Sequence, residues 1–151
     1  MVEVAKKIFI ASDHAGYDLK GILKEHLASQ KYDVEDLGTN DGKTPVDYPD
    51  YAKILCEKVL ANPDSRGVLV CGSGIGISIA ANKVKGIRCG LCHDYYTAVT
   101  SREHNDCNVV AIGARVTGID VAKQIVDVFL KTKFLTDQPR HVKRVEKLNE
   151  L

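Results

Sequence analysis

The chain has 151 residues, of which 44% are hydrophobic, 27% charged and 6% aromatic. This length suits one domain over residues 1–151, and a net charge of +1 with ample apolar content argues against a disordered chain and against a nucleic-acid binder. No apolar run approaches the ~20 residues of a membrane span, and the segment 1–7 lacks the apolar core of a signal peptide. We therefore expect a cytoplasmic protein whose five cysteines are reduced thiols.

Short apolar runs alternate with helical patterns along the whole chain. The predicted strands lie at 8–11, 32–37, 67–70, 87–92 and 109–112. The predicted helices lie at 19–27, 51–59, 77–83, 95–102, 119–130 and, at the C-terminus, 142–148. Strands that alternate with helices need crossover connections. The pattern therefore predicts an α/β fold with a doubly wound, Rossmann-like parallel sheet of about five strands, helices on both faces and a C-terminal helix.

In such a sheet, ligands bind beyond the carboxyl ends of the strands, where the strand order reverses. Residues that can do chemistry follow the predicted strands at 12–14, 71–76, 93–94 and 113–115. Asp13 and His14 place a carboxylate beside an imidazole, and a carboxylate can fix the tautomer of an imidazole or keep it charged. We expect this pair to project into the ligand crevice.

The strongest local motif is a cysteine followed by a glycine-rich loop, between a buried strand and a helix. Glycines allow a tight turn that brings N–H groups against a ligand, and the helix N-terminus adds a positive field. An anion would be held there, and the same field stabilises a thiolate, so Cys71 is a candidate base or nucleophile. The alternative is an ordinary turn with an inert, buried cysteine. The residues of the motif are Cys71, Gly72, Ser73, Gly74, Ile75 and Gly76.

Other readings of these motifs fit less well. The glycine spacing in 72–76 is not that of a dinucleotide-binding loop, and no lysine follows it as in a Walker loop. Ser73 is not the centre of a nucleophile elbow. Cys89 and Cys92 have the spacing of a redox pair, but strand residues three apart point to opposite faces of a sheet. We expect these two thiols to be buried packing residues.

Two further groups suggest an acid or base and an anion site. His104 and Asn105 follow the helix after the fourth strand and supply a second candidate acid or base, although a single histidine is more often structural. Arg140 and Arg144 are four residues apart and share a helix face, which suits the bidentate hydrogen bonds of a phosphate. Arg115, after the fifth strand, could join them. The alternative is a solvated basic face.

Five blocks of the sequence, in the same order, resemble B-type ribose-5-phosphate isomerase. They are 12–16, 71–83, 101–106, 113–115 and 140–144. The resemblance covers nearly the whole chain, and the family also contains galactose-6-phosphate and allose-6-phosphate isomerases. It implies interconversion of D-ribose 5-phosphate and D-ribulose 5-phosphate, and a homodimer or tetramer with sites between subunits.

The resemblance also implies a role for each candidate residue. Cys71 would be the base that moves a proton between carbon 2 and carbon 1 of the sugar, while the loop 72–76 would hold the enediolate oxygens. Ser73 would pass a proton between those oxygens. His104 would assist ring opening, with Asp13 near the ring oxygen. The remaining substrate contacts would be Asn105 on the sugar, and His14, Arg115, Arg140 and Arg144 on the phosphate.

The chemistry of isomerisation agrees with these residue types. The reaction removes a weakly acidic C–H proton and creates charge on oxygen, so it needs a tuned base, N–H donors and exclusion of water. No ligand cluster has zinc spacing, so we expect neither metal nor cofactor. Three alternatives remain open: a hexose 6-phosphate isomerase, a thiol hydrolase with Cys71, His104 and Asn105 as a triad, and a non-catalytic sugar-phosphate binding module.

Overall fold

The structure, a computed structural model, describes residues 6–151, so the expectation about the segment 1–7 falls largely outside the described residues. The strands are β1 (Lys7–Ser12), β2 (Asp33–Asp36), β3 (Ser65–Cys71), β4 (Cys89–Leu91) and β5 (Val109–Gly113). The helices are α1 (Tyr17–Ser29), α2 (Tyr48–Ala61), α3 (Ile75–Asn82), α4 (Tyr95–Glu103), α5 (Ile119–Lys131) and α6 (Pro139–Asn149). None of these helices has the length and apolar character needed to cross a membrane.

All five strands are parallel, and their order in the sheet is β2-β1-β3-β5-β4. The order reverses between β1 and β3, because β2 lies on one side of β1 and β3 on the other. In register, Ser12 lies beside Val70, and Cys71 lies beside Gly113. The carboxyl ends of β1, β3 and β5 therefore meet at the switch point, where the predicted ligand crevice should lie.

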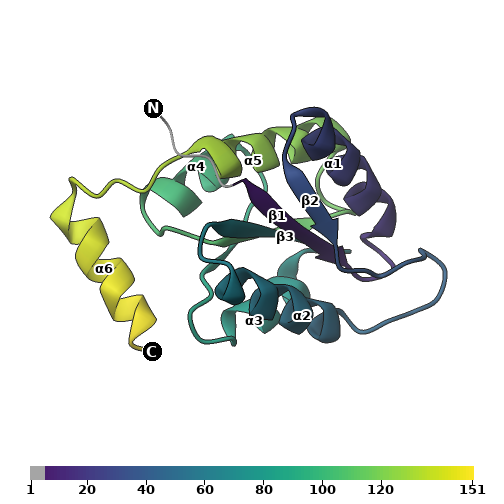
Figure 1. Cartoon of the computed structure of the whole chain (residues 1–151), viewed down its shortest axis with the longest axis horizontal. Helices are drawn as coiled ribbons and strands as arrows, with labels where there is room; N and C mark the ends of the chain where they lie inside the picture. The colour runs from purple at the N-terminus through teal and green to yellow at the C-terminus, as the bar shows by residue number, and fades with distance from the viewer. Residues whose placement is uncertain (1–5) are drawn as a thin grey trace.

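Helices cover both faces of the sheet, as predicted: α1, α4 and α5 lie on one face, and α2 and α3 on the other (Figure 1). Leu23 of α1 and Ile125 of α5 pack on the first face, and Leu55 of α2 and Ile77 of α3 pack on the second. Each fully buried aliphatic side chain contributes about 1.5–3 kcal/mol. Cys71 belongs to the second face, because alternate strand residues point to opposite sides.

The helices that leave the carboxyl edge start at well-defined residues. Gly74, at the N-cap of α3, has a left-handed backbone with a φ of 79°, which favours glycine. Asp94 caps α4, since its carboxylate accepts the Thr97 N–H at 2.8 Å. α2 has Pro49 in its first turn, where the missing N–H costs no helical hydrogen bond. These starts fix where the loops of the carboxyl edge lie.

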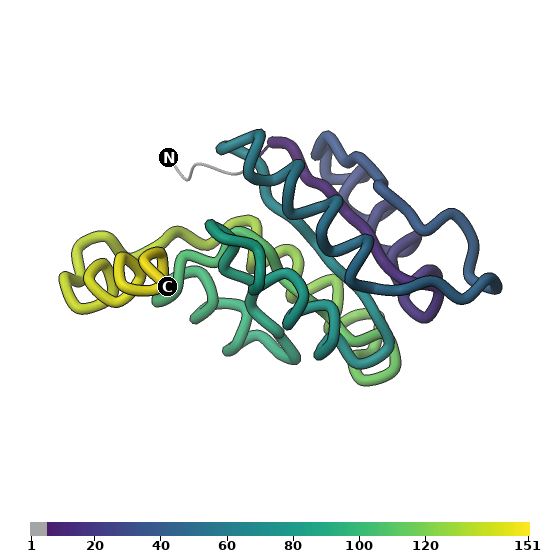
Figure 2. The backbone as a smooth tube through the Cα atoms, turned by 90° about the horizontal axis from the view of Figure 1, so that it is seen from below, coloured from purple at the N-terminus to yellow at the C-terminus, as the bar shows by residue number. Residues whose placement is uncertain are grey.

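α6 stands apart from the rest of the molecule. Both views place it at the end opposite to the loop 38–47, which precedes α2 (Figures 1 and 2). The segment before α6 is tied to α4, because the backbone N–H of Leu135 donates to the carbonyl of Glu103 at 3.1 Å. Of the α6 side chains, His141 and Val145 are buried. α6 therefore docks on the end of α4.

Candidate active site

The Cys71 loop folds around the sulfur atom. The backbone N–H of Gly74 donates to Cys71 Sγ at 3.2 Å, and the N–H of Ile75 donates to Ser73 Oγ at 3.1 Å. Cys71 is 4% exposed, so the thiol lies at the floor of the loop, in contact with the α2 and α3 side of the core. One amide dipole thus points its positive end at the sulfur, as the motif predicts.

The loop is held by close backbone contacts that only glycine permits. A side chain at Gly113 would collide with the carbonyl of Ser73, and one at Gly16 would come within 2.5 Å of the carbonyl oxygen of Val70. The loops after β1, β3 and β5 can therefore approach one another directly. The conformation around Cys71 is fixed by backbone packing from both neighbouring strands.

A carboxylate and a guanidinium flank this loop. Asp13 is 6% exposed, and its Oδ1 accepts the N–H of Gly16 at 3.1 Å. The backbone N–H of Arg115 donates to the carbonyl of Gly72 at 2.9 Å. The Arg115 guanidinium lies over Gly72, where Nη1 would be 3.2 Å from an added Cβ. The structure thus brings Cys71, Asp13 and Arg115 together at the switch point.

His14 belongs to the same group and has a defined tautomer. The backbone N–H of Val46 donates to His14 Nδ1 at 3.1 Å, so Nδ1 carries no proton and the neutral ring carries its proton on Nε2. This leaves Nε2–H as a donor that suits a phosphate oxygen. The loop that contains Val46 thus determines which nitrogen of the neutral His14 ring carries the proton.

Tyr48 is a residue of this edge that the sequence did not reveal. Its ring packs directly on the backbone of Gly76, where an added Cβ would lie 2.5 Å from Tyr48 Cζ. Tyr48 comes from the start of α2, and nothing in its sequence neighbourhood indicates a contact with the glycine loop. The ring forms a wall beside the first turn of α3.

His104 and Asn105 lie at the opposite edge of the sheet. His104 is the C-cap of α4, where its backbone N–H donates to the carbonyl of Thr100 at 3.0 Å. The segment that follows reaches the beginning of β3, because the Gly67 N–H donates to the carbonyl of Asn108 at 3.0 Å. Gly67 is about 13 Å from Cys71, at ~3.3 Å per strand residue. α4 runs back along the sheet and carries these two residues away from the thiol.

The tail arginines lie on that opposite side as well. Arg140 and Arg144 share one face of α6 with Lys143 and Lys147, as the spacing predicts. The expectation that Arg115 joins them is not met within one chain, because α6 lies at the other end of the molecule (Figures 1 and 2). A triad of Cys71, His104 and Asn105 does not form within one chain either. The predicted residues fall into two half-sites: a thiol half-site (Asp13, His14, Cys71–Gly76 and Arg115) and a histidine half-site (His104, Asn105, Arg140 and Arg144).

The histidine half-site contains a further imidazole, that of His141. The rings of His104 and His141 stack with centroids 4.2 Å apart and planes inclined by 14°. Burial and the charges of His104, Arg140 and Arg144 lower the pKa of His141, against a smaller opposing effect of Glu103. The signal for its burial is the spacing of His141 and Val145, which places both on the inner face of α6.

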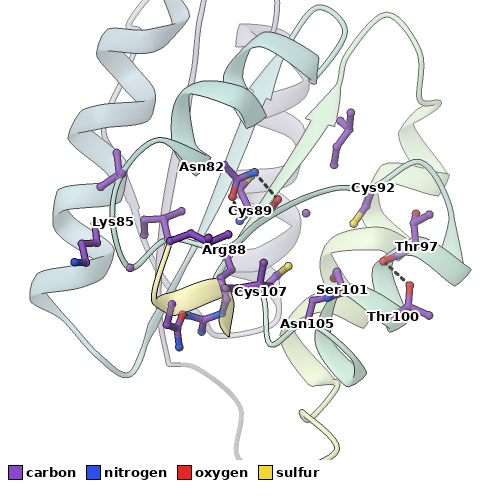
Figure 3. Close-up of a pocket in the computed structure, with 18 residues that line it drawn as sticks. Asn82, Lys85, Arg88, Cys89, Cys92, Thr97, Thr100, Ser101, Asn105 and Cys107 are labelled. Carbon is purple, nitrogen blue, oxygen red and sulfur yellow. Dashed lines mark hydrogen bonds between the residues drawn. The ribbon is translucent and has the colours of Figure 1, made fainter. Parts of the chain in front are cut away.

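A hollow lies beside the histidine half-site. It has a volume of about 510 Å³ and lies between the end of α3, the edge strand β4, α4 and the end of α6 (Figure 3). Asn105 is among its lining residues. Cys89 and Cys92 also line it, and they pack in different cores on opposite faces of the sheet, as predicted. Burial raises the pKa of both thiols, so they are poor nucleophiles at neutral pH.

Fold and site together define an α/β protein with a buried thiol at the start of a glycine-rich loop, at the switch point of its sheet. Residues 8–148 match the family model described as Ribose/Galactose Isomerase. The chain belongs to this family.

Individual relatives resemble the chain over nearly its full length. Ribose-5-phosphate isomerase B of Escherichia coli is 42% identical, over 97% of this chain and 96% of the relative. The solved structure of ribose-5-phosphate isomerase B from Clostridium thermocellum has a TM-score of 0.90 and 48% identity, over 95% of both chains. A structure from Mycoplasma genitalium, with bound ribulose-5-phosphate, has a TM-score of 0.90 and 41% identity, over 95% of this chain and 94% of that one.

Proposed function

We propose that this protein interconverts D-ribose 5-phosphate and D-ribulose 5-phosphate, with Cys71 as the base. The observation that carries the proposal is the position of Cys71: it is the last residue of β3, at the switch point, and its Sγ accepts the Gly74 N–H at 3.2 Å. Arg115 adds a positive charge over the same loop. Relatives over 40% identical carry the name of this activity.

The reaction follows from the groups of the thiol half-site. The Cys71 thiolate removes the proton from carbon 2 of the open-chain aldose, and the C–H electron pair forms the double bond between carbons 1 and 2. The resulting oxyanion accepts hydrogen bonds from N–H groups of the loop. One such donor typically raises the rate by a factor of ~10²–10³. Ser73 transfers a proton from oxygen 2 to oxygen 1. Cys71 then returns its proton to carbon 1, which gives the ketose.

The phosphate serves as a handle that does not react. His14 Nε2–H and the Arg115 guanidinium are donors of one half-site, and Arg140 and Arg144 are donors of the other. Binding energy from this distant group orients the reacting carbons against Cys71. An enzyme that uses all four donors needs the two half-sites to lie next to each other.

We further propose a homodimer whose active sites lie between the subunits. A two-fold axis would place the histidine half-site of each chain beside the thiol half-site of the other, which gives two equivalent sites per dimer. Exposed apolar side chains occupy the carboxyl edge, where the partner would dock, and such a patch is typical of an interface. They include Ile75 and Ile79 of α3, Tyr95 and Tyr96 of α4, and Ile119 of α5. All five cysteines are free thiols, which supports a reducing, cytoplasmic location.

A coupled assay of ribose 5-phosphate conversion, with a chelator present, tests the function. We expect turnover by the wild type and its near-complete loss in Cys71→Ala, because the base is removed while the fold stays. Cys56→Ala changes a buried thiol of α2, outside both half-sites, and should keep its turnover. In D₂O, the wild type should leave deuterium at carbon 2 of the recovered aldose. Normal isomerisation by Cys71→Ala would refute the assignment of the base, and preferred turnover of allose 6-phosphate would point to the hexose phosphates instead.

A further inference from the structure

Two stacked imidazoles form the centre of the histidine half-site. His104 and His141 face each other with their ring centroids 4.2 Å apart, nearly in parallel planes. His141 is 5% exposed, and its Nε2 is buried without a hydrogen-bond partner among residues 6–151. A buried polar nitrogen without a partner destabilises the fold, so an apolar side chain would serve packing better at this position. This points to a role for the ring other than stability.

The backbone around the stack is fixed on both sides. The backbone N–H of His104 donates to Thr100, and that of His141 donates to Gln138, each at 3.0 Å. The contact between Leu135 and Glu103 ties the two helices together. The rings therefore meet at a rigid junction between the end of α4 and the first turn of α6. That first turn also contains Arg140.

The charges around the junction favour the neutral form of the His141 ring. Burial lowers the pKa of His141, and the nearby His104, Arg140 and Arg144 lower it further, with only Glu103 acting against them. A neutral imidazole can accept a proton, which an imidazolium cannot. The neutral ring of His141 thus packs against His104 without adding a positive charge to it.

We propose that His141 is a positioning residue: its ring holds the His104 ring in the orientation that opens the furanose form of ribose 5-phosphate. This inference rests on the proposed function. In the step itself, the hydroxyl on carbon 1 gives its proton to His104, the bond between carbon 1 and the ring oxygen breaks, and the ring oxygen keeps the electron pair and takes a proton from water. The stack links that base to the helix that carries Arg140 and Arg144.

Comparing the aldose with the ketose distinguishes a role in ring opening from a role in proton transfer or in phosphate binding. Ribulose 5-phosphate has no hydroxyl free on carbon 5 and forms no furanose ring, so its enediolate forms without ring opening. Exchange of its carbon 1 hydrogen with D₂O therefore depends on Cys71 and on phosphate binding, but not on His104. A change that misplaces only His104 should slow turnover of the aldose and leave this exchange intact.

The experiment measures both quantities in four variants. The variant His141→Leu removes the stack, His141→Phe keeps an aromatic ring in the same place, and His104→Ala removes the base. Val145→Ala is the control, because it truncates the other buried side chain on the same face of α6. Turnover of ribose 5-phosphate is followed by the coupled assay, and deuterium at carbon 1 of ribulose 5-phosphate by NMR.

We expect His141→Leu to lower kcat for ribose 5-phosphate by ~10–100-fold, as a misplaced catalytic group does, with exchange within about threefold of the wild type. His141→Phe should stay within about threefold in both measurements. His104→Ala should show the same split with a larger loss, of ~10²–10⁴. Adding His141→Leu to His104→Ala should have no further effect on kcat, because both act through the same group.

Several results would overturn the proposal. One is a loss of turnover in His141→Leu that is matched by an equal loss of exchange. That result would mean that the variant only disturbs packing, as Val145→Ala does. Others are unchanged turnover in His141→Leu, a raised KM for both sugars with kcat preserved, or a loss in His141→Phe as large as that in His141→Leu. A wild type that does not convert ribose 5-phosphate would instead refute the proposed function.

Discussion

At the scale of single residues, the buried ammonium group of Lys20 stabilises a loop that contacts the site, although Lys20 lies outside the site. Lys20 is 1% exposed, and its Nζ donates to Asp36 Oδ1 and to the Thr39 carbonyl, both at 2.7 Å. These bonds anchor the start of the loop 38–47, which supplies the Val46 N–H to His14. A buried charge is retained only with such partners. Lys20 thus helps to set the tautomer of a residue that it does not touch.

Asp36 gives this network a defined dependence on pH. Burial works to raise the pKa of Asp36, but hydrogen bonds from Lys20 and from the Gly38 N–H outweigh it and hold the pKa below its usual value. Because the folded-state pKa is the lower one, the carboxylate stabilises the fold above the unfolded value of about 3.9. That stability is lost as the pH falls through the folded value.

We expect Asp36→Asn to lower the free energy of unfolding by ~2–3 kcal/mol at neutral pH, because it leaves Lys20 without its anion. The difference from the wild type should shrink as the pH falls from 5 towards 2, in urea unfolding followed by circular dichroism. Asp33→Asn, on the same strand, removes a carboxylate that is 72% exposed and should change stability by under ~0.5 kcal/mol. A difference for Asp36→Asn that does not depend on pH would contradict this account.

At the scale of elements, the conformation of the loop after β3 depends on the absence of a side chain at the end of β5. Gly113 ends β5 in register with Cys71, and its missing side chain makes room for the carbonyl of Ser73. The Ala114 N–H then donates to the carbonyl of Cys71 at 2.8 Å. The thiol is thus placed by a strand that contributes no group to the chemistry.

We predict that Gly113→Ala lowers stability by ~1–3 kcal/mol through overpacking and lowers kcat more than it raises KM, because it moves the loop around Cys71. Gly21→Ala is the control: Gly21 lies exposed within α1 with no atom near an added Cβ. It should stabilise by ~0.5–1 kcal/mol and leave turnover unchanged. Thermal melts and steady-state kinetics check both. A Gly113→Ala enzyme with normal kcat would show that the loop tolerates the shift.

The sequence predicts these elements well where the pattern is local. Apolar runs marked β1, β3 and β5, and the periodicity of 119–130 marked α5, because burial on a sheet or helix face imposes such spacing. β4 is shorter than predicted, at Cys89–Leu91: the Ile87 N–H turns back to the carbonyl of Val84. A hydrogen bond within a turn replaces the expected strand pairing there. The local sequence pattern does not distinguish the turn from the strand.

At the scale of the whole molecule, the main departure concerns the site. Motifs at the strand ends predicted that Asp13, Cys71 and Arg115 lie at one edge, since parallel strands bring their carboxyl ends together. The position of His104 opposite that edge follows from the direction of α4, and the docking of α6 depends on contacts between distant segments. Sequence patterns do not contain these contacts, so the stack of His104 on His141 and the separation of Arg115 from Arg144 appear only in three dimensions.

The separation of the half-sites leads to the most direct test of a shared isomerase site. Two chains with different tags, one carrying Cys71→Ala and the other His104→Ala, can be expressed together and purified as a mixed dimer. Such a dimer has one site with both changes and one site with neither, so we predict about half of the wild-type turnover per dimer. A mixed dimer of Cys71→Ala with Asp13→Ala, both in the thiol half-site, should stay inactive. If the first mixed dimer is no more active than its two parents, the site does not lie between the subunits, and the account is contradicted.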